Sequence, residues 1–272
     1  MAGEMRARLF FGGRRVEVIA HRGFSGIAPE NTLAAMRRAI EAGADRVEFD
    51  VLLTRDGVPV VIHDPELDRT TDGRGPVAAK TLAQIRALDA GRWFHPQFAA
   101  ERIPMLEEAL VECAGRIAVN VEIKGEAVDP GSLDDPEGVE ARVVAALRRH
   151  GLGESAAVSS FEPRALERVR RLAPEIPLQS LYNRDLHRDL GPVEVCAACG
   201  AGAFNCSVEE VNPRWIVEAH RAGLRVNVYT SDDPEEVENL VSLGVDGIFT
   251  NRPDVLLEVL GRKPWSAGLG ES

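Results

Sequence analysis

Lysine, cysteine and long apolar runs are scarce in this chain of 272 residues, and each scarcity excludes a class of protein. Four cysteines are too few for a fold built on disulfides, so we expect reduced thiols and a cytoplasmic location. No apolar run in the sequence approaches the roughly 20 residues that a transmembrane helix needs. Acidic residues outnumber basic ones by 43 to 32, and the net charge of −11 disfavours nucleic acid and anionic lipid as partners.

Only three of the 32 basic residues are lysines, so each of them (Lys80, Lys124 and Lys263) is a candidate for an individual role. The hydrophobic share of 44% and the charged share of 28% are ordinary for a globular protein and exclude wholesale disorder and coiled coil. Residues 1–15 contain too short an apolar run for a signal peptide, and we interpret them as an N-terminal extension. Residues 16–262 are expected to form one domain, with a tail over residues 263–272.

Short apolar runs alternate with amphipathic runs along the chain, which is typical of βα units and a parallel sheet. The predicted strands are Val16–Ala20, Arg46–Leu53, Ile117–Ile123, Ala156–Phe161, Pro177–Tyr182, Ala203–Cys206, Arg225–Thr230 and Gly247–Thr250. The predicted helices are Thr32–Ala42, Leu106–Ala114, Val139–His150, Pro163–Leu172, Val193–Ala198, Pro213–Ala222, Pro234–Leu243 and Pro253–Leu260. Several helices begin with proline and end at glycine. Eight units predict a single closed (β/α)₈ barrel, the TIM-barrel fold, in preference to a doubly wound open sheet.

One run departs from the alternation. The strand Arg46–Leu53 is followed by a four-residue turn and a second run, Pro59–His63, and so short a turn makes the two strands antiparallel. With the turn centred between Arg55 and Asp56, Glu48 is expected opposite His63. Residues 64–104 then form a long insertion after the second strand, and insertions of that length inside a barrel are usually lids or binding loops.

Charged side chains stand at the carboxyl ends of the first strands, where barrel active sites lie. Glu48 and Asp50 point to one face of the second strand, and Glu122 repeats the arrangement on the next. Carboxylates two residues apart lie roughly 6–7 Å apart and repel by about 2–3 kcal/mol at an effective dielectric of 20. Isolated acidic residues are more often solvated or paired with arginine. Three together favour a divalent cation, either Mg²⁺ or Ca²⁺.

Two histidines and two cations accompany these carboxylates. His21 ends the first strand and His63 ends the hairpin, so the fold is expected to place both at the same mouth as an acid–base pair. Each of them alone would more often be a structural histidine. Arg22 offers a bidentate fork for a phosphate, and Lys124 offsets part of the negative charge.

The ordered motifs of the chain resemble those of the glycerophosphodiester phosphodiesterase family. The resemblance extends from about Val16 to Leu260 and is carried by the segments Val18–Gly23, Pro29–Thr32, Val47–Val51, Thr54–Gly57, Val60–Asp64, Leu67–Gly73, Ile103–Glu108, Val121–Lys124 and Gly244–Pro253. It implies hydrolysis of glycerophosphodiesters, such as glycerophosphocholine or glycerophosphoethanolamine, to glycerol 3-phosphate and an alcohol. Family chemistry has the metal activate the glycerol 2-hydroxyl, which attacks phosphorus to give a cyclic phosphate that water then opens.

The resemblance also implies roles for individual residues. Glu48, Asp50 and Glu122 match the metal ligands of the family, and His21 and His63 match its general acid–base pair. Arg22 and Lys124 match the cations that contact the phosphate. The spacing leaves open which histidine gives the proton and which takes it.

The sequence departs from the family at Tyr229–Thr230, where Trp-Thr is usual near the end of the seventh strand. Tyr229 keeps an aromatic wall for the substrate but adds a hydroxyl that needs a partner. Two other functions fit the same residues. The site could accept lysophospholipids or another phosphodiester, with the aromatic segment Trp93–Phe98 holding an acyl chain, or the barrel could bind phosphate without catalysis. Whether the chain forms a homo-oligomer is left open.

Overall fold

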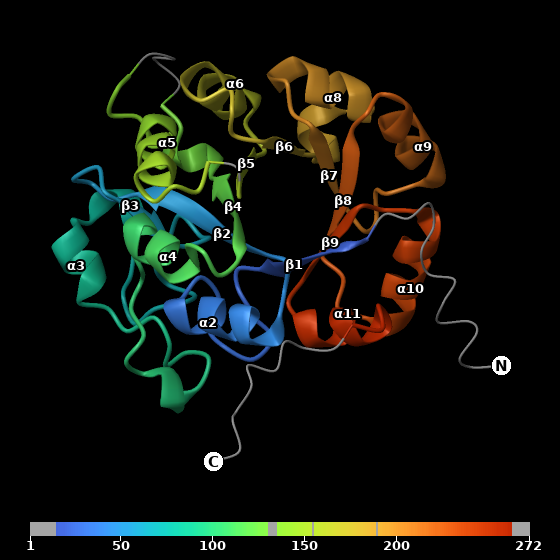
Figure 1. Cartoon of the computed structure of the whole chain (residues 1–272). Coiled ribbons are helices and arrows are strands. Elements are labelled where there is room, and N and C mark those ends of the chain that lie inside the picture. The colour runs from blue at the N-terminus through green and yellow to red at the C-terminus, as the bar shows by residue number, and fades with distance from the viewer. Residues whose placement is uncertain (1–14, 130–134, 154, 189, 263–272) are drawn as a thin grey trace.

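The structure is a computed structural model that describes residues 15–129, 135–153, 155–188 and 190–262. Within these residues, eight parallel strands close into a ring in the order β1-β9-β8-β7-β6-β5-β4-β2, and pairing of β1 with β2 completes it. Figure 1 shows helices arranged around the strands. The predicted (β/α)₈ barrel is therefore confirmed, with one extra strand, β3, outside the ring. The N-terminal extension up to residue 14 and the tail over residues 263–272 lie outside the described residues.

The strands and helices follow the predicted alternation. The strands are β1 (Glu17–His21), β2 (Arg46–Leu53), β3 (Pro59–Val61), β4 (Ala118–Ile123), β5 (Ala156–Ser160), β6 (Leu178–Leu181), β7 (Ala203–Ser207), β8 (Arg225–Tyr229) and β9 (Gly247–Thr250). The longer helices are α2 (Leu33–Ala42), α4 (Leu106–Cys113), α5 (Val139–Arg149), α6 (Pro163–Leu172), α8 (Pro192–Cys199), α9 (Pro213–Arg221), α10 (Pro234–Leu243) and α11 (Pro253–Val259). Among the described residues, no helix has both the length and the apolar character needed to cross a bilayer.

Local sequence signals explain where these helices begin and end. Thr32 caps the start of α2, since its side-chain oxygen accepts a hydrogen bond from the amide of Ala35. Gly43 ends the same helix with φ 83°, a left-handed conformation that glycine adopts without strain. Five of the longer helices among the described residues have proline in their first turn, where its missing amide hydrogen costs nothing.

The register of the hairpin differs from the prediction by one residue. Val51 pairs with Val61, so Glu48 is not opposite His63, and β3 ends before that histidine. The reason lies in the turn, where the amide of Thr54 bonds the carbonyl of Val58 and leaves a three-residue loop. Gly57 closes this loop at φ 76°, the left-handed position that three-residue hairpin loops require.

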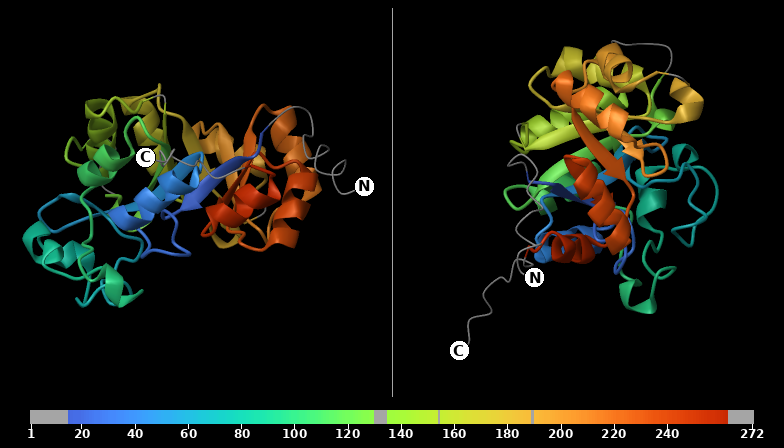
Figure 2. Two further views of the ribbon diagram at one scale, coloured as in Figure 1. Left: turned by 60° about the horizontal axis from the view of Figure 1, so that its bottom comes forward. Right: turned by 90° about the vertical axis from the view of Figure 1, so that its right-hand side faces the viewer.

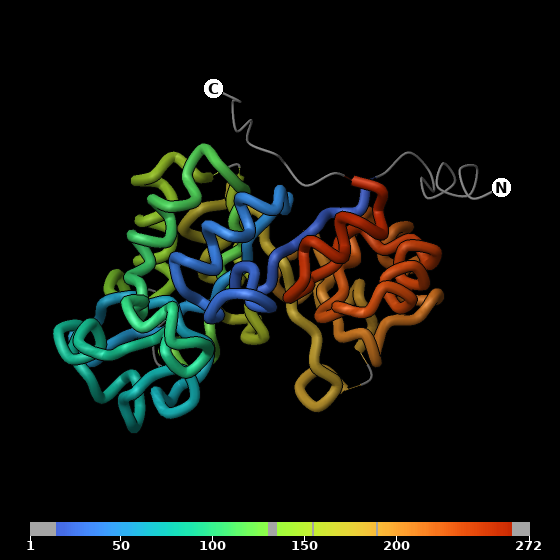
Figure 3. The backbone as a smooth tube through the Cα atoms, turned by 90° about the horizontal axis from the view of Figure 1, so that it is seen from below, coloured from blue at the N-terminus to red at the C-terminus, as the bar shows by residue number. Residues whose placement is uncertain are grey.

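The insertion over residues 64–104 contains short helices that the sequence pattern did not predict. They are η3 (Val77–Ala79), α3 (Leu82–Arg86) and η4 (Pro96–Phe98). The insertion forms a second apolar core against the hairpin, built from Leu52, Val60, Ile62, Leu67, Val77, Ile85, Ala90 and Ile103. Figure 2 shows the insertion, in teal, at one side of the barrel. In Figure 3 it extends from the same end of the barrel as the segment around the short helix α7 (Arg184–His187), opposite the end where β1 begins.

Candidate active site at the carboxyl ends of the strands

Three carboxylates, two of them buried and one partly buried, meet at the carboxyl ends of β2 and β4. Asp50 and Glu122 are direct partners in the parallel register, and Glu48 lies one pleat earlier on the same face of β2. Each of the three offers an oxygen, and these oxygens all lie within 4.8 Å of one another. Glu48 and Asp50 are almost fully buried. The parallel pairing of two neighbouring strands therefore brings together the three acidic residues that the sequence singled out.

The protonation of this cluster reflects burial and mutual repulsion. Burial raises the pKa of Glu48 well above its usual range, and the charges of Asp50 and Glu122 add to the effect. Burial, followed by the charge of Asp50, raises the pKa of Glu122 to about 7. Burial alone would also raise the pKa of Asp50, but Lys124 and Arg22 outweigh it and hold that pKa below its usual value. Asp50 is thus the ionised centre of the cluster.

Two cations face the carboxylates. The Nζ atom of Lys124 lies 2.9 Å from Glu122 and 3.4 Å from Asp50. The Nε atom of Arg22 lies 3.5 Å from Asp50, while its Nη1 donates to Glu30 over 2.8 Å. Both side chains therefore place hydrogen-bond donors beside the carboxylate cluster. Such donors could also contact a phosphate bound there.

The turn after β1 shapes this part of the site. Arg22 has φ 57°, an uncommon conformation for a residue other than glycine, and its amide donates to Glu48 over 2.9 Å. Gly23 follows at φ 83°, and a Cβ there would lie only 2.6 Å from atoms of Ala35. The glycine is therefore needed for close packing of the turn on α2. The strained turn directs a backbone hydrogen-bond donor at the cluster.

The carboxylates fit a divalent cation. Glu48 Oε1 is buried and has no hydrogen-bond partner among the described residues, whereas its Oε2 accepts the Arg22 amide. A buried carboxylate oxygen without a partner is costly, and a cation would satisfy it. The donor set is all oxygen, which Mg²⁺ and Ca²⁺ prefer. Glu48, Asp50 and Glu122 are therefore the residues that could hold such an ion.

The two histidines lie at the same mouth but have different partners. His21 ends β1 in register with Glu48, and its Nδ1 atom lies 2.8 Å from the side-chain oxygen of Asn251. Burial, reinforced by Arg22, lowers the pKa of His21 to about 4. His63 follows β3, lies close enough to Asp50 to lower its pKa, and has Nδ1 2.6 Å from Asp64. The structure brings both histidines to the end of the barrel where the carboxylates lie, although the predicted hairpin register was wrong.

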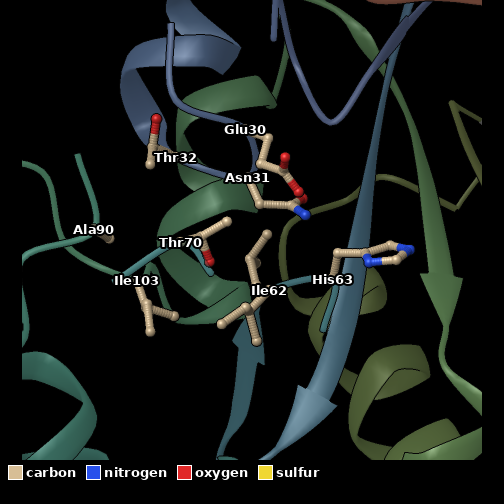
Figure 4. A pocket seen from close by; sticks show the side chains of 9 residues that line it. Glu30, Asn31, Thr32, Ile62, His63, Thr70, Ala90 and Ile103 are labelled. Atoms are coloured by element: carbon tan, nitrogen blue, oxygen red, sulfur yellow. The ribbon is translucent and has the colours of Figure 1, made fainter. Parts of the chain in front are cut away.

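A chain of ion pairs connects His63 to the insertion. Arg69 binds Glu30 with two nitrogens and Asp64 with two nitrogens, and Glu30 also pairs with Arg22. Figure 4 shows the neighbouring cleft, in which Glu30 and His63 lie beside residues of the insertion, with the His63 ring pointing away from the apolar side chains. The insertion is thus attached to the site through charged side chains.

Tyr229 forms part of the wall of the barrel mouth. It ends β8, and its ring packs edge-on against Phe161 and Phe249, with centroid separations of 6.1 and 6.3 Å. Its hydroxyl donates to the backbone carbonyl of Tyr182. The hydroxyl that distinguishes this residue from tryptophan therefore has its partner within the protein, and the ring remains an apolar surface.

Several residues near the site had no role in the sequence analysis. Asn31 donates to Asp50 over 2.8 Å, and Asp232 accepts one hydrogen bond from Thr250, the last residue of β9, and two from Asn251. Asn31 and Asn251 do lie in the motifs Pro29–Thr32 and Gly244–Pro253. Their presence in ordered motifs was the available signal, but the side chains that they contact come from distant parts of the chain.

The fold and the comparisons together define the chain as a barrel enzyme of the phosphoric diester hydrolase class. The sequence model of the glycerophosphoryl diester phosphodiesterase family matches residues 21–255, and the chain belongs to this family. The resemblance inferred from the motifs is thereby confirmed, and a barrel that merely binds phosphate is disfavoured.

Individual relatives agree with this assignment. A glycerophosphodiester phosphodiesterase of Caldanaerobacter subterraneus is 37% identical over 244 residues, covering 89% of this chain and 97% of the relative. A phosphodiesterase of Oleispira antarctica, solved in complex with the product sn-glycerol 3-phosphate, superposes with a TM-score of 0.82 at 31% identity, covering 90% and 96% of the two chains. A glycerophosphodiester phosphodiesterase of Agrobacterium tumefaciens gives a TM-score of 0.77 at 32% identity, covering 90% and 100%.

Proposed function

We propose that this protein is a metal-dependent glycerophosphodiester phosphodiesterase. It would release sn-glycerol 3-phosphate and an alcohol from substrates such as glycerophosphocholine or glycerophosphoethanolamine. The observation that carries the proposal is the meeting of three carboxylates, with oxygens within 4.8 Å of one another, beside two cations and two imidazoles. The product-bound relative from Oleispira antarctica supports the same substrate class.

Each group has a chemical role in this proposal. A divalent cation held by Glu48, Asp50 and Glu122 supplies charge neutralisation and Lewis-acid polarisation when bound. Arg22 and Lys124 contact the phosphate oxygens and fix the orientation of the diester. Tyr229 contributes an apolar wall against the glycerol or headgroup.

The histidines move the protons. One of the pair, His21 or His63, removes the proton of the glycerol 2-hydroxyl as that oxygen attacks phosphorus, and the other gives a proton to the departing alcohol oxygen. The resulting cyclic phosphate is opened by water with the two roles exchanged. Proton transfer between positioned side chains and the substrate contributes about 100-fold or more to the rate.

The test is the release of glycerol 3-phosphate from glycerophosphocholine by the full chain, with EDTA and after addition of excess Mg²⁺ or Ca²⁺. We expect loss of activity in the chelator and recovery with one of the ions. His21→Ala and His63→Ala should each lower kcat about 100-fold or more. His95→Ala is the matched control, because His95 is an exposed histidine of the insertion. Full activity in EDTA, or wild-type rates in either active-site variant, would contradict the proposal.

A second substrate class is favoured by one observation. Trp93 is 40% exposed on the insertion and packs edge-on against Phe94, which in turn contacts Phe98. This aromatic group offers an apolar surface that an acyl chain of a lysophospholipid could contact. Hydrolysis rates measured side by side on glycerophosphocholine and on its long-chain acyl derivative show which of the two substrate classes the protein prefers. A cytoplasmic location remains a prediction, and an oligomeric state is left open.

A further inference from the structure

The side chain of Asn251 has a defined orientation because a carboxylate lies on one side of it. Asp232 accepts from the backbone amide of Asn251 over 2.6 Å and from its side-chain nitrogen Nδ2 over 2.8 Å. Thr250 adds a third donor to the same carboxylate. An ionised carboxylate only accepts hydrogen bonds, so the NH₂ group of Asn251 has to face Asp232. Its oxygen Oδ1 consequently points the other way.

That oxygen determines which nitrogen of His21 carries the proton. Asn251 Oδ1 lies 2.8 Å from His21 Nδ1 and 2.8 Å from the hydroxyl of Ser25. Because an amide oxygen cannot donate, His21 has to donate through Nδ1–H. In the neutral ring, a proton on Nδ1 leaves the lone pair on Nε2.

The strand order shows where this lone pair points. β1 lies between β9, which leads into Asn251, and β2, which carries Glu48 and Asp50. Because Nδ1 and Nε2 flank Cε1 and point in widely divergent directions, holding Nδ1 on the β9 side leaves Nε2 on the side of the ring away from β9. A free acceptor is thereby directed at the region where the substrate would react.

The hydrogen-bond partner of His63 is a charged carboxylate and not a neutral amide. Its Nδ1 lies 2.6 Å from Asp64, a carboxylate that Arg69 holds in place with two hydrogen bonds. The Asp64 carboxylate can only accept, so His63 donates to a charged partner, whereas His21 donates to the neutral amide of Asn251. The two histidines of the site are therefore not equivalent.

We propose that Asn251, oriented by Asp232, is a positioning residue that holds His21 as the Nδ1–H tautomer with Nε2 free to accept a proton. His21 then takes the proton from the attacking hydroxyl, and His63 gives one to the departing alcohol. This assignment of roles rests on the proposed function, whereas the hold of Asn251 on the tautomer does not depend on the substrate.

The tautomer can be read directly from ¹⁵N-labelled histidine in the Mg²⁺-loaded full chain at pH 7. Long-range proton–nitrogen correlation spectra distinguish a protonated Nδ1 from a protonated Nε2. We expect Nδ1–H for His21 in the wild type and a substantial Nε2–H population in Asn251→Ala. Asn251→Asp retains an acceptor oxygen toward His21 and should keep the Nδ1–H form.

The kinetic readout separates positioning from binding. Asn251→Ala should lower kcat roughly 10- to 100-fold, the usual effect of losing a residue that orients a reactive group, while KM changes less than about twofold. Asn251→Asp should retain more activity than Asn251→Ala. The matched control is Asn212→Ala, which removes an asparagine that caps α9 away from His21 and should leave tautomer and kcat unchanged.

The outcomes are distinguishable. An Nε2–H tautomer in the wild type, or an unchanged tautomer and kcat in Asn251→Ala, would overturn the proposal. If Asn251→Ala does not fold, Asp232→Asn provides the test, since an amide there no longer forces the orientation of Asn251; a mixed His21 tautomer is expected, and an unchanged one counts against us. A wild type with the Nδ1–H tautomer but no release of glycerol 3-phosphate would refute the proposed function alone.

Discussion

Glu122, a partly buried residue of the carboxylate cluster, destabilises the fold when it is ionised. Its carboxylate oxygen lies within 4.8 Å of two others, and at an effective dielectric of 20 each such pair of charges repels by about 3.5 kcal/mol. Burial and this repulsion raise its pKa to about 7, even though Lys124 lies 2.9 Å away. Without a cation, the ionised form of Glu122 therefore destabilises the native state.

We predict that Glu122→Gln stabilises the protein in EDTA, and that the effect depends on pH. A pKa raised on folding means that the native state binds the proton more tightly than the unfolded chain. This contribution is complete below about pH 4.5 and is lost as the pH rises through about 7. The variant should therefore be more stable than the wild type by about 3 kcal/mol at pH 8.5, and similar to it at pH 4.5. Urea denaturation at both pH values measures the difference.

The result is interpretable because Gln has nearly the shape of Glu and only its charge differs. Glu126→Gln is the control, since Glu126 is an exposed residue four positions further along the chain. A variant less stable than the wild type at pH 8.5 would show that the ion pair with Lys124 outweighs the repulsion.

At the scale of elements, the insertion is held to the barrel by two different kinds of contact. One is the apolar core that it forms against the hairpin, which includes Leu67, Ile85 and Ile103. The other is Arg69, which joins Glu30 of the loop before α2 to Asp64 beside His63. The apolar core fixes the insertion on the barrel, whereas Arg69 connects it through Asp64 to His63 and through Glu30 to Arg22.

We predict that Arg69→Met loosens the segment around Asp64 without unfolding the insertion. Glu30 and Asp64 would lose their shared cation, and His63 would lose the restraint on its carboxylate partner. We expect kcat to fall roughly 10-fold, as is usual when a partner of a reactive group is lost. Faster hydrogen exchange should be confined to the segment between residues 64 and 75.

Arg74→Met is the control for this prediction, because Arg74 is a strongly exposed arginine of the same insertion with one long ion pair to Asp68. Unchanged kcat and exchange in Arg69→Met would mean that the apolar core alone positions Asp64.

For the whole molecule, closure of the barrel connects the site to the stability of every strand. The proposed metal ligands come from β2 and β4, and His21 comes from β1. The ring closes because β1 pairs with β9, which is the last strand in the sequence. A cation bound only by the folded barrel should therefore stabilise the entire domain by mass action.

We predict that Mg²⁺ or Ca²⁺ at 100 times its dissociation constant raises the free energy of unfolding by about 2.7 kcal/mol. Asp50→Asn should abolish this increase, because Asp50 is the ionised centre of the cluster. At one fixed ion concentration, the gain should be larger at pH 8 than at pH 5, because protons compete with the ion for Glu122, whose pKa lies at about 7. Denaturation curves over a metal titration measure both effects, and equal gains in wild type and Asp50→Asn would rule out this site.

The sequence by itself determined the barrel and most of the candidate site. Strands repeat every two residues and parallel strands end at one face, so Glu48, Asp50 and Glu122 could be placed together from spacing alone. His21 and Lys124 followed from the same rule. These features depend on periodicities that are local to each strand.

Only the tertiary structure decided the hydrogen-bond partners of the two histidines and the register of the hairpin. The hairpin register depended on the left-handed conformation of Gly57, which closes a three-residue loop in place of the predicted four-residue turn. The partner of His21 lies 230 residues away and reaches it only because β9 closes the ring onto β1. Hydrogen-bond direction, unlike strand periodicity, is set by the groups that meet in space, and for this reason the unequal environments of the two histidines could be seen only in the fold.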